Sequence, residues 1–427
     1  MNRHPNRIAA CLTCAVLIAI GPAMAEEKVI KEGDKPAVIK AVESALRPQP
    51  KPLSENVKKG LEWLVKNQLD NGSWAQGEES AEMGTGMAKI KSTPNVADTC
   101  MATMALFRSG STAKEGTYKD NVLKAVKFVC AQIEESDANS LSITTLQGTR
   151  TQAKLGTYID TFMAAQVLAE LKGSMPDEAT TKRVEAALAK VVRKMELNQK
   201  QDGRWTNEGW APTLAQAQAS KALNSVVMNG GDVSEKVRER AEKVARDDFK
   251  TTKGGTVASS DSAGVVLYSA GGQIASIQAS ATVNAGMRDK LEAVVSSATS
   301  QPEQKALAVA TLKRFDENEK DLKAAQESFI ARMDDKQFIS GFGSNGGEEF
   351  LSYLNIGESL ILRGGKEWEK WDKSITDNLN RVQNQDGSWT GHHCITGRTF
   401  CTSAAMMVLT IDRSPAPAAT KIKEAKK

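Results

Sequence analysis

Hydrophobic and polar positions along this 427-residue chain alternate between two kinds of helical segment. One kind is charged and carries its apolar residues on a single stripe, which is typical of a helix that packs on one side only. The other kind is rich in Ala and nearly uncharged, as in residues 98–109 (DTCMATMALFRS), so it must be surrounded by protein. Alternating strand-like patterns are almost absent. The pattern predicts an all-α fold.

The two kinds of segment form a repeat in which a charged outer helix precedes an uncharged inner one. Stacking of such units buries a continuous core. The predicted pairs, outer member first, are 54–68 with 98–109, 119–135 with 158–172, 178–198 with 211–228, 234–249 with 259–277, 282–299 with 301–314, 317–333 with 347–363, and 366–384 with 399–412. Alternation at this period predicts a closed two-layer ring, an α/α-toroid. Six or seven hairpins fit, because the pair at 282–314 is short.

The two ends of the chain differ from the repeat. Two arginines, a short apolar stretch and small residues before position 25 indicate a signal peptide over residues 1–25. We therefore expect an exported protein, either periplasmic or extracellular, without a transmembrane segment in its mature part. The mature chain would consist of a Pro-rich spacer, the repeat domain and a disordered basic tail, at residues 26–52, 53–413 and 414–427.

Charge and cysteine content narrow the class of protein. The formal charge is +4, and loss of two arginines with the signal peptide leaves +2 (54 basic minus 52 acidic residues). This near balance argues against nucleic-acid binding, which needs a concentrated basic surface. A small molecule, a glycan or a protein remains as the expected partner. Among the mature cysteines, Cys394 and Cys401 are the favoured disulfide in an oxidising compartment, with Cys100–Cys401 as the alternative.

Three predicted loops carry one motif: QLDNGSW at 68–74, QKQDGRW at 199–205 and QNQDGSW at 383–389. Asn-Gly and Asp-Gly favour tight turns because Gly tolerates positive φ. We interpret the Gln as the end of the outer helix and the Trp as a group that stacks over it and locks one hairpin onto the next. These structural staples, which carry no chemistry, are Gln68, Trp74, Gln199, Trp205, Gln383 and Trp389.

Together with the upstream segment KGLEWL at 59–64, the first motif resembles the QW repeat of squalene and oxidosqualene cyclases. Residues 345–353 and 387–401 are similar to segments of exported bacterial proteins of the prenyltransferase and squalene oxidase repeat type, within the terpenoid cyclase and protein prenyltransferase superfamily. The resemblance covers nearly all of the mature chain and implies the α/α-toroid. It does not imply an activity, because one fold hosts many functions.

The cyclase chemistry of that superfamily is not expected here. Its class II cyclases protonate an alkene with an Asp-x-Asp-Asp motif, which this sequence lacks. They also line the cavity with aromatic rings that stabilise a carbocation. Aromatic residues make up only 5% of this chain, and three tryptophans already belong to the staple motif.

The zinc chemistry of protein prenyltransferases is matched in part. Those enzymes hold zinc with Asp-x-Cys and a later His, and Asp98-Thr99-Cys100 fits the first half. At the second place this chain has Cys401, while His392 and His393 lie in the preceding loop. A zinc site built from these Asp, Cys and His residues is therefore one hypothesis. The simpler alternative makes Asp98 a helix N-cap and Cys100 a small apolar residue.

Five acidic residues lie near the predicted starts of inner helices: Asp98, Asp160, Asp261, Glu348 and Glu349. These helix ends should gather at one mouth of the ring, where the helix dipoles favour anions. Two carboxylates about 6–9 Å apart would suit an inverting glycosidase, and Arg398 is a further ligand candidate. Acidic caps around a solvent-filled rim are the simpler interpretation.

We therefore expect a binding or structural role, since every motif of a known reaction is absent or incomplete. The alternative is a zinc-dependent enzyme that acts on an isoprenoid-like or carbohydrate substrate at the mouth. No residue is assigned a catalytic role, and zinc is the one cofactor that the sequence suggests.

Overall fold

The computed structural model describes residues 49–79 and 90–414, and within them the chain is mainly helical. The strands in these ranges are β1 (Trp74–Ala75) and β2 (Pro94–Asn95), which pair antiparallel. The predicted all-α class is thus confirmed. The predicted signal peptide, the spacer up to residue 48 and the tail from residue 415 lie outside the described residues. No helix in the described part is long and apolar enough to cross a membrane.

Outer and inner helices alternate along the chain as the pattern predicts. The outer helices are α2 (Glu55–Lys66), α4 (Lys119–Glu135), α7 (Glu178–Asn198), α9 (Glu235–Thr251), α11 (Pro302–Ile330) and α14 (Gly365–Arg381). The inner helices are α3 (Val96–Arg108), α6 (Ile159–Glu170), α8 (Pro212–Met228), α10 (Val266–Ser296), α13 (Gly347–Arg363) and α15 (Arg398–Leu409). The short helices α5 (Arg150–Leu155) and α12 (Lys336–Ile339) and the 3₁₀ turns η2 (Ser260–Ser262) and η3 (Ile411–Arg413) lie in the connections.

The number of hairpins in the described residues is therefore six. The predicted separate pair at 282–314 is wrong, because residues 259–277 and 282–299 largely belong to one helix, α10, and residues 301–314 and 317–333 to another, α11. Neither junction contains Gly or Pro, and Gln278-Ala279-Ser280-Ala281 continues the helix without a break. The chain turns only at Ser297–Gln301, before Pro302 starts the next helix.

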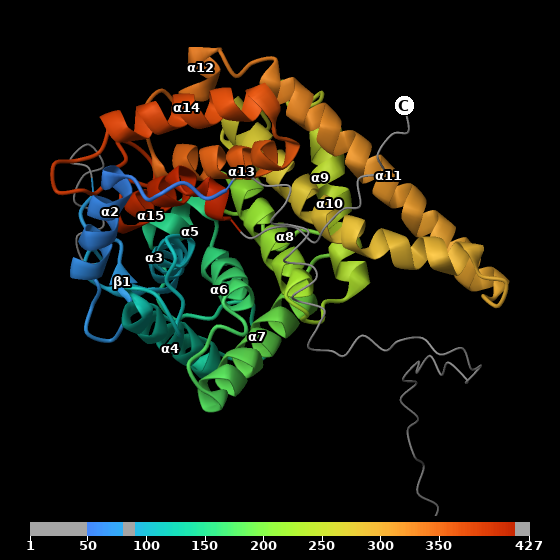
Figure 1. The fold of residues 1–427 in the computed structure, drawn as a ribbon, viewed down its shortest axis with the longest axis horizontal. Helices are drawn as coiled ribbons and strands as arrows, with labels where there is room; N and C mark the ends of the chain where they lie inside the picture. The colour runs from blue at the N-terminus through green and yellow to red at the C-terminus, as the bar shows by residue number, and fades with distance from the viewer. Residues whose placement is uncertain (1–48, 80–89, 415–427) are drawn as a thin grey trace, which may run out of the picture.

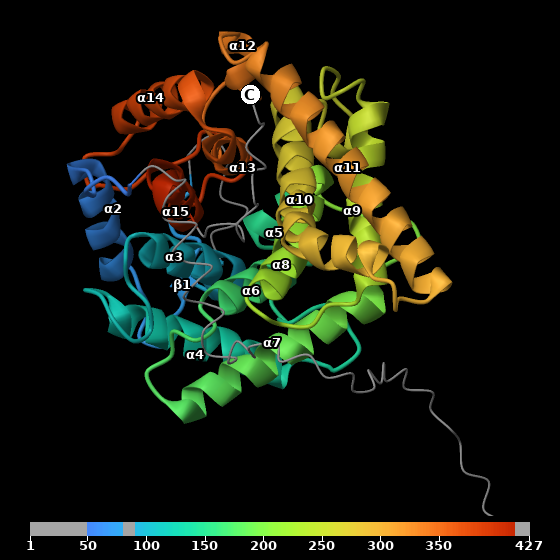
Figure 2. The ribbon, with the colours of Figure 1, turned by 45° about the vertical axis from the view of Figure 1, so that its right-hand side comes forward.

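The inner helices contact one another in a closed cycle, in which α3, α6, α8, α10, α13 and α15 follow in order and α15 returns to α3. Figures 1 and 2 show these helices inside and the charged helices around them. Composition explains the two layers. Every residue of α6 from Ile159 to Ala169 is buried, whereas α14 buries one stripe (Trp368, Trp371, Ile375 and Leu379).

The three motif loops have the same geometry. Each Trp is buried, and its indole N–H donates to a carbonyl ten residues earlier in the outer helix, at Leu64, Met195 and Leu379 (2.7–2.8 Å). Each Gly has φ of 87–89° and abuts the next outer helix so closely that a Cβ would lie within 2.7 Å of its backbone. The Trp therefore fixes its own outer helix, and the Gly allows the next one to approach.

The motif glutamines join neighbouring hairpins. The side-chain amide of Gln68 donates to the Asn121 carbonyl in α4 (3.0 Å), and that of Gln199 donates to the Val237 carbonyl in α9 (3.0 Å). Gln383, in the last hairpin, donates to the Asn56 carbonyl in the first (2.8 Å). The Gln side chain, and not the expected stacking of the Trp, thus joins each hairpin to its neighbour. Gln383 does the same between the last hairpin and the first.

We call this meeting of the first and last hairpins the seam. It includes the end of the predicted spacer, since the Lys51 backbone N–H donates to Asp412 (2.7 Å) and the Lys51 ammonium pairs with Asp372. The Thr399 hydroxyl also donates to the Ala75 carbonyl (2.7 Å). Residues 49–52 are therefore attached to the folded domain.

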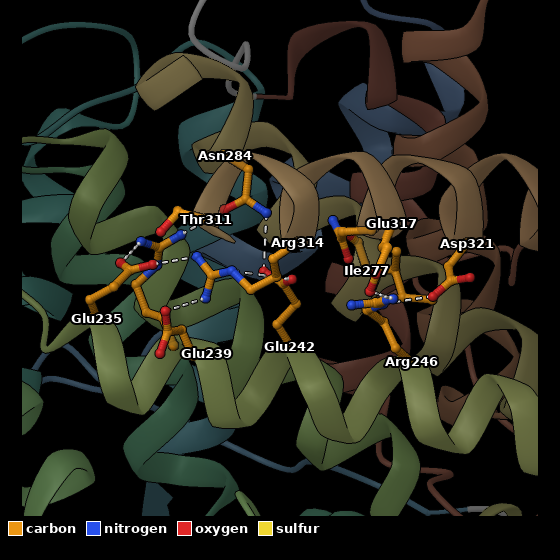
Figure 3. Close-up of polar contacts among 12 residues, drawn as sticks. Glu235, Glu239, Glu242, Arg246, Ile277, Asn284, Thr311, Arg314, Glu317 and Asp321 are labelled. Carbon is orange, nitrogen blue, oxygen red and sulfur yellow. Dashed lines mark hydrogen bonds and ion pairs between the residues drawn. The ribbon is translucent and has the colours of Figure 1, made fainter. Parts of the chain in front are cut away.

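The far ends of α10 and α11 extend beyond the other helices, at the right of Figure 1. Ion pairs attach α11 to the outer helix α9. Arg314 pairs with Glu235 (2.6 Å) and Glu239 (2.9 Å), and Arg246 pairs with Glu317 (2.9 Å) and Asp321 (2.6 Å), as Figure 3 shows. These contacts hold the base of the projecting pair in place.

Candidate functional site

Asp98 and Asp160 lie in the first turns of α3 and α6 and are buried, each 1% exposed. Asp98 is not the N-cap. Asn95 fills that position and accepts the Asp98 backbone N–H (2.9 Å), because α3 begins two residues earlier than expected. Asp160 caps a neighbouring helix, since its carboxylate accepts the Ala97 backbone N–H of α3 (2.9 Å) and the Gln152 side-chain amide (2.8 Å). Both carboxylate oxygens of Asp160 thus have hydrogen-bond partners, whereas neither carboxylate oxygen of Asp98 has one among the described residues.

Glu348 and Glu349 lie in the first turn of α13 and have no exposed surface. One Glu348 oxygen accepts the Ile395 backbone N–H (3.0 Å), and the other has no hydrogen-bond partner among the described residues. One Glu349 oxygen accepts the Tyr268 hydroxyl (2.5 Å) and the Phe342 backbone N–H (3.0 Å). The expected solvent-filled acidic rim is therefore wrong, because these carboxyls are packed inside protein.

Burial raises the pKa of all four carboxyls. Desolvation, with a contribution from the nearby charge of Asp160, raises the pKa of Asp98 to about 7. Desolvation and the charge of Glu349 raise the pKa of Glu348 to about 8. The pKa values of Asp160 and Glu349 also rise through burial, against the effect of their hydrogen bonds. Near neutral pH, Asp98 and Glu348 are therefore poised to hold protons.

The residues of the predicted zinc site are not assembled as a metal site. No group of three or more His, Cys, Asp or Glu within the described ranges is arranged to hold a metal ion. Burial and the charges of Asp160 and Asp98 raise the pKa of the Cys100 thiol well above its usual range, and burial and Glu348 do the same for Cys401. Such thiols resist the deprotonation that zinc binding requires.

The two histidines differ in exposure, and the candidate disulfide cysteines are not bonded to each other. His392 is exposed, while His393 donates from Nε2 to the Ser344 carbonyl (2.8 Å) and lies 3.5 Å from Glu349. The four cysteines in the described residues are buried free thiols, so neither predicted disulfide is formed. Cys401 instead donates to the Ile395 carbonyl (3.3 Å).

The middle of the ring contains little space. A cavity of about 20 Å³ lies there, lined by Cys100, by methionine and leucine side chains, and by the polar side chains of Arg108, Gln166, Gln218 and Lys221. This volume is close to the minimum that holds one water molecule. Flexible methionines fill the space between the inner helices. The ring interior therefore has no room for a substrate the size of a terpenoid at this level.

A larger hollow lies on the outside, at the seam. This seam groove has a volume of about 720 Å³ and is lined by Lys59, Glu62, Trp63, Lys66, Asn67, Leu69, Ala75, Gly77, Glu78, Lys91, Ser92, Gln385, Asp386, Arg398 and Thr399. Arg398, predicted as a ligand residue of the mouth, is thus separated from the buried acids and pairs with Asp386 (2.5 Å). Of the candidate ligand residues, it is the one that borders this groove.

Sequence reasoning missed the other groove residues. Lys59, Glu62, Trp63 and Lys66 look like ordinary positions of a charged outer helix, and Gln385 looks like part of a turn. The KGLEWL segment, the motif loops at 68–74 and 383–389 and the segment 387–401 contain part of this set, but the pattern marked them as structural or family features and not as one groove. The groove arises because α2 and the loop before α15 meet, which local sequence does not reveal.

Comparisons with protein-family models, with curated proteins and with solved structures find no match to this chain.

Proposed function

We propose that this chain is an exported α/α-toroid with a binding role and that the seam groove holds its ligand. The cycle of inner-helix contacts and the bonds across the seam support the toroid. The N-terminal sequence supports export. The motif loops support a relationship to the prenyltransferase and squalene oxidase repeat proteins, without their cyclase chemistry.

The observation that carries the binding role is a contrast in volume. The seam groove offers about 720 Å³, whereas the two hollows between the inner helices measure about 20 Å³ and about 100 Å³. Ligand sites usually measure about 300–1,000 Å³. A role that depends on a ligand inside the packed centre of the ring is therefore less well supported than one at the seam.

The groove chemistry favours a neutral glycan. Two of its cations are paired with its own acids, Lys91 with Glu78 (2.8 Å) and Arg398 with Asp386 (2.5 Å), so the groove does not select strongly for one charge. Trp63 offers an apolar face on which a sugar ring can stack. Carboxylate and amide side chains around it can exchange hydrogen bonds with sugar hydroxyls.

The test is calorimetric titration of the mature protein with a panel of neutral oligosaccharides. We expect Trp63→Ala and Gln385→Ala to weaken binding at least about tenfold, which corresponds to 1.4 kcal/mol. Trp210→Ala is the matched control, because Trp210 is 45% exposed and lies outside the groove. Circular dichroism checks that each variant folds. Absence of binding by the whole panel, or equal effects of the Trp63 and Trp210 variants, would contradict the proposal.

A further inference from the structure

A second hollow, which we call the axial cavity, lies inside the ring at the C-terminal ends of the inner helices. Its volume is about 100 Å³, and it is bordered by four charged residues, Arg108, Glu170, Lys221 and Glu358. Arg108 and Glu170 are the last residues of α3 and α6. The axial cavity is separate from the seam groove, since no residue borders both.

Glu358 holds both cations of the axial cavity. Its carboxylate pairs with Arg108 (2.6 Å) and with Lys221 (2.7 Å). Burial opposes ionisation, but the charges of Lys221 and Arg108 prevail and lower the pKa of Glu358 to about 2. The three groups therefore form a fixed, charged wall whose net charge is positive.

Glu170 balances that charge without an ion pair of its own. No Lys or Arg nitrogen of the described residues lies within ion-pair distance of its carboxylate, although one oxygen accepts the Gln166 side-chain amide (2.5 Å). The other oxygen is buried without a hydrogen-bond partner in the described part of the chain. A buried carboxylate oxygen is stable only when a hydrogen-bond donor is close to it.

Arg108 presents the complementary group. It is only 3% exposed, and its Nε has no hydrogen-bond partner among the described residues, although its Nη1 binds both Glu358 and Ser414. Buried donors and acceptors are almost always paired in folded proteins. A donor and an acceptor at one cavity, neither of them paired within the described ranges, thus point to a molecule that supplies both partners.

We propose that the axial cavity binds a small zwitterion, such as a short amino acid, with its ammonium at Glu170 and its carboxylate at Arg108. Burial raises the pKa of Glu170, and a ligand ammonium beside it would favour its ionised form. The four charges of the cavity then sum to zero, so a ligand with a single charge would leave one buried charge uncompensated. A cavity of about 150 Å³ accommodates the six carbons of benzene, so a cavity of about 100 Å³ encloses roughly four non-hydrogen atoms, which restricts the ligand to one close to glycine in size. Met228, Ala275, Ala279 and Leu362 line the apolar part and would contact its carbon chain.

The test is calorimetric titration of the mature protein with glycine, L-alanine and β-alanine. Ethylamine and propionate serve as single-charge controls. We expect at least one zwitterion to bind at least tenfold more tightly than either control. Saturable binding of none of the three, or equal binding of propionate or ethylamine, would overturn the proposal and leave water as the occupant.

Two variants locate the site. Ala279→Leu fills the cavity and leaves every charge in place, so zwitterion binding should be lost. Glu170→Gln removes the charge at constant shape and leaves the Arg108–Glu358 pair intact, so affinity should fall at least tenfold. Leu307→Ala, at a position 70% exposed on the projecting end of α11, is the control and should bind as the parent does. Unchanged binding in Ala279→Leu, with its fold verified by circular dichroism, would place the ligand elsewhere.

Discussion

Asp98 and Glu348 are carboxyl groups with almost no contact with solvent, and each has at least one oxygen without a partner among the described residues. A protonated acid is tolerated in such surroundings, whereas a carboxylate costs several kcal/mol of desolvation. Their folded-state pKa values, about 7 and about 8, lie above the ordinary values of 3.8 and 4.5. The stability that these groups contribute below their unfolded pKa is therefore lost as pH rises through the folded pKa.

We predict that the free energy of unfolding decreases between pH 5 and pH 9. Within this window Asp98 alone accounts for a loss on the order of 3 kcal/mol, because about two pH units separate pH 5 from its folded pKa of about 7, at 1.36 kcal/mol each. Urea denaturation at a series of pH values measures this. In Asp98→Asn the pH dependence should shrink by a similar amount, because the variant cannot ionise. A stability that rises from pH 5 to pH 9 would contradict the burial of these acids.

Trp74 tests the packing of a motif loop. It has no exposed surface, and its indole N–H reaches a carbonyl of α2. Trp74→Ala should lower the free energy of unfolding by about 3–5 kcal/mol, through the cavity that it leaves. Chemical denaturation compares it with the exposed Trp210→Ala, which should change stability by about 0.5 kcal/mol or less. Similar small effects in both variants would show that Trp74 is not a buried anchor.

At the scale of elements, the sequence pattern predicts the alternation of outer and inner helices and the positions of the three motif loops well. It divides α10 and α11 wrongly, because the change from uncharged to charged residues within one helix resembles a boundary between two. That change occurs where α10 leaves the protein interior. A helix continues through such a change in composition unless a helix-breaking residue interrupts it, so the change in charge content alone does not mark a helix end.

The motif glutamines join neighbouring helices, and their removal should therefore have local effects. Gln383 donates to the Gly387 and Asn56 carbonyls, so one side chain joins α14 and α2 across the seam. Gln383→Ala should cost about 1–3 kcal/mol, because partly buried carbonyls lose their partner. In Gln383→Ala, hydrogen exchange should become faster in α2 and stay unchanged in α9. In Gln199→Ala, it should become faster in α9 and stay unchanged in α2. Uniform exchange changes across all helices would contradict a local link.

At the scale of the whole molecule, the inner helices gather buried acids at their N-terminal ends, while the C-terminal ends of α3 and α6 carry one cation, Arg108, and one acid, Glu170. The N-terminal acids and Arg108 agree with the helix dipoles, which favour anions at the first end and cations at the second, and Glu170 does not. The sequence indicated the acids near the helix starts. It could not show their burial, because the direction of a first-turn side chain depends on where the helix begins, and α3 begins at Val96. The seam groove was likewise hidden, since its two walls are more than 300 residues apart.

The seam is the premise of the proposed function, and zero-length carbodiimide cross-linking of the monomeric protein tests it most directly. The Lys51 ammonium contacts Asp372 across the seam, and Lys370 contacts Asp334 nearby in the same outer layer. Mass spectrometry should find both amide links in the parent protein, and Asp372→Asn should lose only the first. Recovery of the Lys370–Asp334 link without the Lys51–Asp372 link would show that the chain does not close and that the groove is not formed.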